Sequence, residues 1–295
     1  MGDARIGLVG LGKMGAPMAR NLLRAGFRVD GFDLGPGAGR DLDAIDGFTR
    51  AGSAAGAARD ANLVILMLPD SPAVDALLWG SPGLAAALAA GSLVVDMGSS
   101  DPSCSRVNAQ RLGAAGVGFV DAPVSGGVRR AIDGSLSIMI GGREADVARA
   151  RPVLEALGRT LIHVGDAGAG HAVKALNNYV SAAGLIAVSE ALVAARRFGI
   201  DPHVVNSVFN ASTGKNNTTE HKVENFMLSG RYDSGFALAL MRKDIQTAVG
   251  FIDRMGSPGE FARKTLDVAR NAEQALGDGA DHTAVHAWVS GRAPD

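Results

Sequence analysis

Apolar and polar residues follow one pattern before residue 165 and another after it. In the first part, short apolar runs rich in Val, Ile and Leu alternate with helical patterns. Continuous apolar strands separated by helices are typical of a parallel sheet that is covered on both faces. The pattern therefore predicts an α/β fold, a doubly wound parallel sheet, over residues 1–164. The expected strands are Arg5–Gly10, Phe27–Phe32, Asn62–Leu68, Ser92–Met97, Gly118–Val124, Ser135–Ile140 and Thr160–Val164.

The second part of the chain reads as helices, and one of them is long. Gly165–Gly199 holds about thirty residues without Pro between its glycines, rich in Ala, Leu and Val, which predicts a single helix. Because this segment is apolar nearly all round, we expect protein to cover it on most sides. Residues 165–295 are predicted to form an all-helical C-terminal domain, which the long helix joins to the first domain. The other expected helices are Pro202–Phe209, Glu220–Leu228, Ser234–Thr247, Gly259–Leu276 and His282–Ser290.

Composition and charge narrow the class of protein. Hydrophobic residues make up 47% of the chain, charged residues 20%, and the formal net charge is -1. A near-neutral balance without a basic run offers no electrostatic surface for nucleic acid or a membrane. The single cysteine, Cys104, favours a reducing compartment. The apolar run Ala182–Ala195 contains Ser189 and Glu190 and is expected to be too short for a membrane span. We therefore expect a cytoplasmic protein with no nucleic acid and no membrane as partner.

A glycine motif stands between the first strand and the first helix. Gly10-Leu-Gly12-Lys-Met-Gly15 fits GxGxxG, the fingerprint of a dinucleotide-binding turn. Gly10 permits the tight turn, Gly12 lets the backbone approach a pyrophosphate, and Gly15 lets the helix pack on the strand. The pyrophosphate would face the free N–H groups of the helix N-terminus. In a chain with 40 glycines the motif alone is weak evidence for a cofactor site. Its position between a predicted strand and a predicted helix makes it a predicted cofactor loop, and this loop includes Lys13 and Met14.

Asp33 follows the second strand, 18 residues after Gly15 (33 − 15). A carboxylate there would accept the hydroxyl groups of the adenosine ribose, and it would repel a 2′-phosphate. The sequence therefore favours NAD as cofactor. NADP remains an alternative because Arg40 lies within reach of the same loop. A solvated Asp beside a Gly-rich turn is the purely structural interpretation.

Other candidates follow from the rule that ligands bind at the carboxyl ends of parallel strands. Leu68, Pro69 and Ser99 follow two of the expected strands and are candidate cofactor contacts, although loop residues occur at the same places. After the strand Gly118–Val124 comes Ser125-Gly126-Gly127, which offers a hydroxyl group and backbone N–H groups to a small anion such as a carboxylate. A plain turn is the alternative interpretation of that sequence.

Four motifs in order resemble the β-hydroxyacid dehydrogenase family, which includes 3-hydroxyisobutyrate dehydrogenases and tartronate semialdehyde reductases. They are GLGKMGAPMARNLLRAG at Gly10–Gly26, DAPVSGG at Asp121–Gly127, GAGHAVKALNN at Gly168–Asn178 and MRKD at Met241–Asp244. The resemblance spans nearly the whole chain. It implies a Rossmann-type N-terminal domain and an all-helical C-terminal domain joined by a long helix.

The resemblance also implies roles for individual residues. The substrate carboxylate would bind to Ser125, Gly126 and Gly127, the catalytic lysine falls on Lys174, and the substrate-orienting asparagine on Asn178. The lysine of the KD motif, Lys243, would lie near the nicotinamide end of the cofactor, and Phe236 is expected in the same region.

A lysine suits the implied chemistry. Oxidising an alcohol requires a group that takes the hydroxyl proton, and the reverse reaction requires the same group to protonate the carbonyl oxygen. Lysine serves both directions if its pKa falls from ~10.4 toward neutrality. An apolar helix around Lys174 and a neighbouring Lys243 would both lower that pKa. Without the other motifs, a lysine extending from a helix end to solvent would be the better interpretation.

The predicted function is NAD-dependent interconversion of a small β-hydroxy acid and its semialdehyde or ketone, with a small carboxylate as substrate. The alternatives are a reductase of tartronate, glyoxylate or succinate semialdehyde, and a non-catalytic dinucleotide-binding scaffold. Ser181 stands where the related 6-phosphogluconate dehydrogenases carry a glutamate acid, and Lys174 argues against imine reductases. No metal site is predicted, because His282 and His286 lack a third ligand. The apolar helices favour a homodimer or homotetramer.

Overall fold

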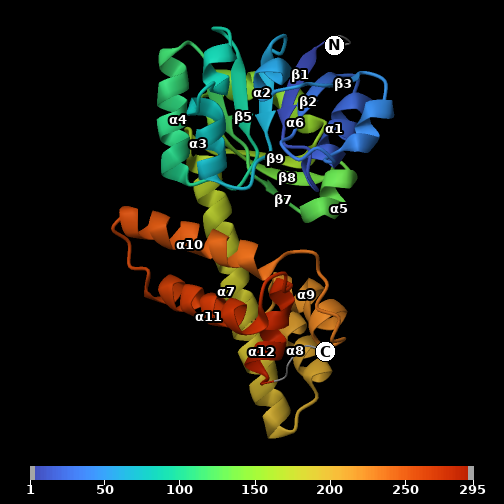
Figure 1. Ribbon diagram of the computed structural model, residues 1–295. Coiled ribbons are helices and arrows are strands. Elements are labelled where there is room, and N and C mark those ends of the chain that lie inside the picture. Colours follow the sequence, from blue (N-terminus) through green and yellow to red (C-terminus); the bar gives the residue numbers. More distant parts are fainter. Residues whose placement is uncertain (1–3, 292–295) are drawn as a thin grey trace. The chain divides into compact units, whose positions relative to one another are not determined.

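The computed structural model describes residues 4–291 (Figure 1). The chain forms two compact units, of which the first ends at Lys174 and the second begins at Ala175. This division falls inside one continuous helix, whereas the sequence pattern changes at the start of that helix. Each unit has its own hydrophobic core.

The first unit is built on a single nine-stranded sheet. Strands β1 to β6 are parallel in the order β3-β2-β1-β4-β5-β6, the order of the doubly wound dinucleotide-binding fold. Beyond β6 the sheet continues through β8, which is antiparallel to β6 and β7 and parallel to β9. The strands are β1 (Arg5–Val9), β2 (Arg28–Phe32), β3 (Phe48–Arg50), β4 (Leu63–Leu66), β5 (Leu93–Asp96), β6 (Gly118–Asp121), β7 (Val124–Ser125), β8 (Leu136–Gly142) and β9 (Gly158–Gly165).

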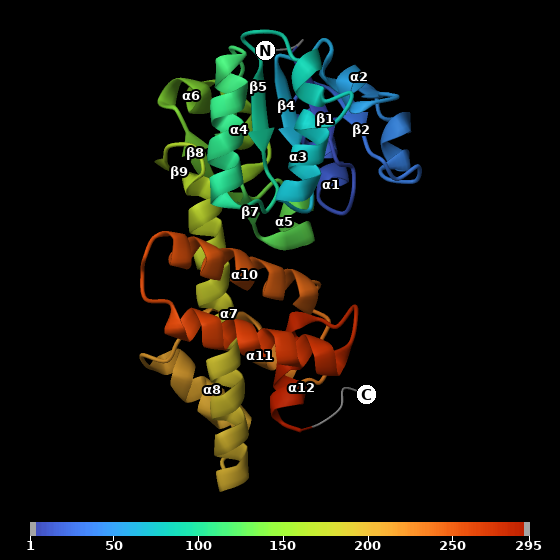
Figure 2. The ribbon, with the colours of Figure 1, turned by 60° about the vertical axis from the view of Figure 1, so that its left-hand side comes forward.

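Helices cover both faces of the parallel part of the sheet. Neighbouring residues of a strand point to opposite faces, so each strand contributes side chains to two cores. Leu8, Ile65 and Val95 belong to one core cluster, and Val64 and Val94 to another. The first cluster includes residues of α1 (Gly15–Arg24), α5 (Gly127–Ile132) and α6 (Glu144–Glu155). The second includes residues of α2 (Ala54–Ala58), α3 (Ser71–Trp79) and α4 (Pro102–Ala114). Figure 2 shows α3 and α4 on the same face of the sheet, and the Trp79 indole N–H joins them by donating to Asn108 at 2.7 Å.

Helix α7 (Ala169–Phe198) is the predicted long helix. It is less covered than its composition led us to expect, since 33% of its most apolar stretch is buried and the side chains of Val180 and Phe198 are 66% and 85% exposed. By length and composition it also meets the criteria for a membrane span, contrary to the expectation drawn from the shorter apolar run. Core helices of soluble proteins meet the same criteria, and Leu185 and Leu192 of α7 are buried in the core of the second unit.

The second unit is helical throughout its described part, apart from a single β-bridge between Ala237 and Asp281. Its core is formed by α7 together with α10 and α11, which pack against each other. Its other elements are α8 (Pro202–Ala211), α9 (Asn217–His221), the π-helical turn Val223–Met227, α10 (Leu238–Arg254), α11 (Glu260–Leu276), the 3-10 turn His282–Ala284 and α12 (Val285–Val289). The expected single helix over 220–228 is therefore two short elements, and the expected helix start at Ser234 lies four residues early.

Candidate functional site

The three glycines of the first turn have distinct steric surroundings. Gly10 has φ +101°, and a Cβ there would lie 2.3 Å from the Met67 carbonyl oxygen. A Cβ on Gly15 would lie 1.8 Å from the Gly10 carbonyl oxygen. At Gly12, by contrast, a Cβ would have no neighbour within 4 Å among residues 4–291, and the residue is exposed. Gly10 and Gly15 are thus required by the turn itself, while Gly12 leaves open space above the backbone where a ligand can approach.

Asp33 lies beside this turn. Its Oδ2 accepts the Leu11 backbone N–H at 2.7 Å, and its Oδ1 accepts the Gly35 N–H at 2.7 Å. The carboxylate is therefore oriented by backbone donors directly after β2, with further lone pairs left to accept hydroxyl hydrogen bonds. Arg40 is exposed and donates to the Pro36 carbonyl oxygen at 3.0 Å.

The other candidate cofactor residues of this unit lie on the same edge of the sheet. Lys13 is exposed and Met14 half-buried at the start of α1, while just after β4 and β5 Leu68 and Ser99 are half-buried and Pro69 is exposed. The loop after β5 is stiffened by Asp96, whose carboxylate accepts the Gly98 N–H at 3.0 Å and the Ser100 hydroxyl at 2.8 Å. The carboxyl ends of β1, β2, β4 and β5 thus bring these candidates to one edge.

Ser125-Gly126-Gly127 forms the link between β7 and α5. Ser125 pairs with Ser137 of β8, and Gly126 and Gly127 follow with φ +125° and +65°. These positive φ values explain the Gly-Gly pair, because side-chain-bearing residues rarely adopt them. Both glycines are exposed, so their backbone is open to a ligand.

A buried polar cluster fastens the start of α7 to the sheet. Asp96 and Asp121 end β5 and β6 and face each other in register. Asp121 accepts the backbone N–H groups of Gly168 at 2.7 Å and His171 at 2.8 Å. The His171 imidazole is fully buried, with Nδ1 2.7 Å from Ser105 Oγ and Nε2 3.9 Å from Asp96 Oδ2. His171 thus joins α7 to α4 and to two strands.

Lys174 lies one turn after His171, and Asn178 one turn after Lys174. The Asn178 amide nitrogen donates to Asp244 Oδ2 at 2.6 Å, and its Oδ1 accepts from Asn177 at 3.1 Å. Asp244 is buried on α10, and its other oxygen lies 3.4 Å from the Lys243 ammonium. The sequence motif MRKD drew attention to Lys243, but Asp244 is the residue that connects Lys243 to Asn178.

Phe236 lies just before α10 and packs edge-on against the His282 ring, with the ring centroids 5.4 Å apart. Its backbone N–H donates to Asp281 Oδ2 at 3.2 Å. Burial chiefly lowers the pKa of His282, and the positive charge of Lys222 adds to this effect. Burial alone would raise the pKa of Asp281, but hydrogen bonds from His282, Thr283 and Ser234 hold it well below its usual range.

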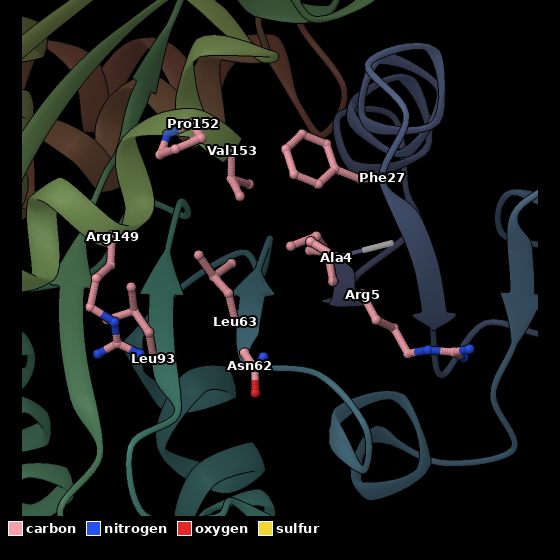
Figure 3. A pocket seen from close by; sticks show the side chains of 10 residues that line it. Ala4, Arg5, Phe27, Asn62, Leu63, Leu93, Arg149, Pro152 and Val153 are labelled. Atoms are coloured by element: carbon pink, nitrogen blue, oxygen red, sulfur yellow. The ribbon is translucent and has the colours of Figure 1, made fainter. Parts of the chain in front are cut away.

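The hollow drawn in Figure 3 lies away from these residues. Its volume is 260 Å³, and it opens at the amino ends of β1, β4 and β5, where Arg5, Leu63 and Leu93 begin the strands. The guanidinium of Arg5 is paired with Asp30 at 2.9 Å, and that of Arg149 donates to the Gly91 carbonyl oxygen at 2.6 Å. Its cationic groups are thus engaged within the protein. Among residues 4–291, no three His, Cys, Asp or Glu side chains are grouped to hold a metal ion.

The residues at the carboxyl edge fit a dinucleotide. The open space at Gly12 leaves room for the pyrophosphate, and Asp33 holds a carboxylate next to the turn. Bound there, the dinucleotide would contact the Gly10–Gly15 turn through its phosphates and Asp33 through its adenosine ribose.

Comparison with known proteins identifies the family of the chain. Residues 5–165 match the family model described as the NAD binding domain of 6-phosphogluconate dehydrogenase, and residues 168–289 match that described as NAD-binding of NADP-dependent 3-hydroxyisobutyrate dehydrogenase. The chain is 37% identical over 245 residues to 2-(hydroxymethyl)glutarate dehydrogenase of Eubacterium barkeri, covering 83% of this chain and 81% of that protein. It is 36% identical over 296 residues to 3-hydroxyisobutyrate dehydrogenase of Pseudomonas aeruginosa, covering 97% and 99%.

A solved structure gives the same result. The 3-hydroxyisobutyrate dehydrogenase of Mycobacterium tuberculosis, solved with L-serine, has a TM-score of 0.88 and 33% identity and covers 97% of this chain and 99% of that one. The predicted Rossmann-type domain and helical C-terminal domain are thereby confirmed. The chain belongs to the β-hydroxyacid dehydrogenase family, whose members are NAD(P)-dependent oxidoreductases.

Proposed function

We propose that this enzyme reversibly oxidises a small β-hydroxy acid to its semialdehyde or ketone, with Lys174 as the general acid and base. NAD is the preferred cofactor, with NADP as the alternative. The observation that carries the proposal is the pair Lys174 and Asn178, one turn apart on α7, with the Asn178 amide held by the buried carboxylate of Asp244. Because this hydrogen bond already holds the Asn178 side chain, little further side-chain entropy is lost when a substrate binds there.

The chain's own residues perform the acid–base part of the reaction. When bound, NAD(P) would supply the acceptor for the hydride of the carbinol carbon. In the oxidation, the Lys174 amine takes the hydroxyl proton, and in the reduction its ammonium returns the proton to the carbonyl oxygen. The Ser125 hydroxyl and the N–H groups of Gly126 and Gly127 bind the substrate carboxylate.

The placements described above support the following proposed cofactor roles. The turn that contains Gly10, Gly12, Lys13, Met14 and Gly15 binds the diphosphate, and Asp33 selects NAD through the ribose hydroxyl groups. The remaining contacts to the cofactor are assigned to Leu68, Pro69, Ser99, Phe236 and Lys243.

The relatives suggest the reacting unit of the substrate. 3-Hydroxyisobutyrate and 2-(hydroxymethyl)glutarate, the substrates in the names of two relatives, share a hydroxymethyl group on the carbon that carries the carboxylate. We propose that the substrate of this enzyme also carries a hydroxymethyl group on the carbon that bears its carboxylate. Reduction of tartronate or succinate semialdehyde is the same type of reaction in reverse. The alternative function is therefore a reductase that works mainly toward the alcohol.

We also propose that the enzyme is cytoplasmic and forms a homodimer or homotetramer. Support comes from the exposed apolar side chains of Val180, Phe198 and Phe261, which are 66%, 85% and 63% exposed in the single chain. Burial of such groups between copies is the common way to remove them from water. Light scattering that finds only a 30.1 kDa species at micromolar concentration would refute the oligomer.

A substrate panel tests the function itself. The enzyme is incubated with NAD or NADP and with 3-hydroxyisobutyrate, 2-(hydroxymethyl)glutarate, L-serine or glycerate, and absorbance at the NADH band is followed. We expect turnover of at least one hydroxy acid, and a higher kcat/KM with NAD. Tight binding of NAD without turnover of any panel member, in either direction, would favour the non-catalytic scaffold.

A further inference from the structure

Lys222 is a partly buried cation that the mechanism above does not use. It follows α9 directly and caps that helix. Its Nζ lies 3.5 Å from the Ser181 hydroxyl of α7, at the outer limit of a hydrogen bond. No carboxylate of the described residues lies within the 4.0 Å that defines an ion pair with this ammonium. Lysines are rarely withdrawn from water without such a partner.

The acidic residues around Lys222 are engaged by other groups. Glu220 pairs with Lys215 at 2.9 Å, and Glu224 accepts from His203 at 2.7 Å and from Asn206 at 3.0 Å.

Asp281, whose charge acts on Lys222 through space, is also occupied. It accepts from the Ser234 hydroxyl at 2.9 Å, from the backbone N–H of Gly235 at 2.9 Å and from both the N–H and the hydroxyl of Thr283. His282 offers no compensation, because burial lowers its pKa and favours the neutral ring. Among the described residues, the Lys222 ammonium therefore lacks a close anionic partner.

Burial of Lys222 is the main cause that lowers its pKa from 10.5 to about 8, and the charge of Asp281 offsets only part of this. At pH 7 the side chain is still mostly an ammonium. An anion brought next to it would remove the energetic penalty of this buried charge.

Lys222 reaches α7 on the face that carries the catalytic pair. Lys174, Asn178 and Ser181 are spaced i, i+4 and i+7, so they lie on one stripe of the helix. Ser181 lies two turns, about 10 Å, along α7 from Lys174. The segment before Lys222 also lies against this helix, because a Cβ on Gly184 would be 3.6 Å from Asn216 Oδ1.

We propose that Lys222 and Ser181 form a subsite for a second carboxylate of the substrate, so that the enzyme prefers hydroxy dicarboxylates to hydroxy monocarboxylates. The second carboxylate sits at the end of a chain of a few carbons that extends along α7 from the carbon reacting at Lys174. The proposal rests on the proposed function, since it places the substrate of that same site. Lys222 is a specificity residue and takes no part in proton transfer.

The test compares two substrates that share their reacting unit. 2-(Hydroxymethyl)glutarate differs from 3-hydroxyisobutyrate by a carboxymethyl extension on the methyl group. Wild type, Lys222→Met, Lys222→Arg and the control Lys264→Met are assayed with both at saturating NAD; Lys264 is an exposed lysine of α11. We expect Lys222→Met to raise KM for the dicarboxylate tenfold or more with kcat within threefold. For the monocarboxylate, both constants stay within threefold, and Lys222→Arg restores part of the dicarboxylate KM.

The pH profile adds a measurement that a merely structural role would not change. In wild type, KM for the dicarboxylate rises above about pH 8 as Lys222 loses its proton, and in Lys222→Arg this rise is absent. Equal losses on both substrates in Lys222→Met, or no change on either, would overturn the subsite.

A binding measurement separates this proposal from the proposed function. Glutarate and butyrate, which lack the reacting hydroxyl, are titrated calorimetrically into the enzyme with NAD present. Tighter binding of glutarate that disappears in Lys222→Met supports the subsite even if no hydroxy acid is turned over. Equal binding of glutarate by wild type and Lys222→Met refutes it even if turnover is observed.

Discussion

Replacing Lys222 by Met tests the energetics of the buried ammonium independently of any ligand. The pKa of Lys222 is lowered from 10.5 to about 8, a difference of 10.5 − 8 = 2.5 pH units. At 1.36 kcal/mol per unit, keeping the charge in the folded state at pH 7 costs at most about 3 kcal/mol of unfolding free energy. The side chain is partly exposed, and solvent screening reduces this figure. Because Met has a similar length and no charge, we expect Lys222→Met to be about 1–3 kcal/mol more stable than wild type.

The sign of the pH dependence follows from the direction of the shift. Between the folded pKa of about 8 and the unfolded pKa of 10.5, the unfolded chain binds more protons at Lys222 than the folded protein does. Wild-type stability therefore rises with pH across this window, relative to a variant that lacks the group. The advantage of Lys222→Met is full below about pH 8 and disappears as pH approaches 10.5.

Urea unfolding followed by circular dichroism, at pH 7 and near pH 10, measures both effects. Lys264→Met is the matched control and is expected to change stability by less than about 0.5 kcal/mol at either pH. If Lys222→Met is less stable than wild type at pH 7, or if the difference between them does not change with pH, the reasoning about the uncompensated ammonium is wrong.

Three further predictions concern the cofactor loop and the second core. In the described part of the chain, the Cβ of Gly12→Ala has no neighbour within 4 Å, so we expect an unchanged melting temperature but at least tenfold weaker NAD binding by calorimetry. Asp33→Asn removes the negative charge, and we expect the NADP-to-NAD ratio of kcat/KM to rise about 10- to 100-fold; an unchanged ratio would contradict the role of Asp33. Leu185→Ala opens a cavity in the second core, and a urea titration should show a loss of about 3 kcal/mol.

The elements that the sequence predicted well are those with a local cause. The strand before Gly10 and the helix after Gly15 are marked by their own glycines, and the steric clashes at both positions show why no other residue fits. The long α7 follows from thirty residues without a helix breaker. In each case the residues that determine the structure lie next to one another in the chain.

The elements that were missed depend on distant residues. Strand β3 has three residues and exists through its pairing with β2, and α5 is six residues long and starts at glycines that read as a turn. Neither carries enough periodicity to stand out from a loop.

The same limit applies to the site. Lys174 and Asn178 could be predicted because they share a motif, but the partner of Asn178 is Asp244, 66 residues away. The burial of His171 between Asp96 and Asp121 depends on the register of two strands, which the sequence does not display. Nothing in the sequence singles out Lys222, because its distinguishing property is that the acidic residues around it are bound to other groups.

The central claim is that Lys174 is the acid–base group, and one measurement tests it most directly. kcat/KM is determined from NADH absorbance for wild type, Lys174→Ala and the surface control Lys264→Ala, with the best substrate of the panel. The account predicts that Lys174→Ala loses about 100- to 10,000-fold, with NAD binding retained, and that Lys264→Ala is unchanged. A folded Lys174→Ala enzyme that turns over within tenfold of wild type would contradict it.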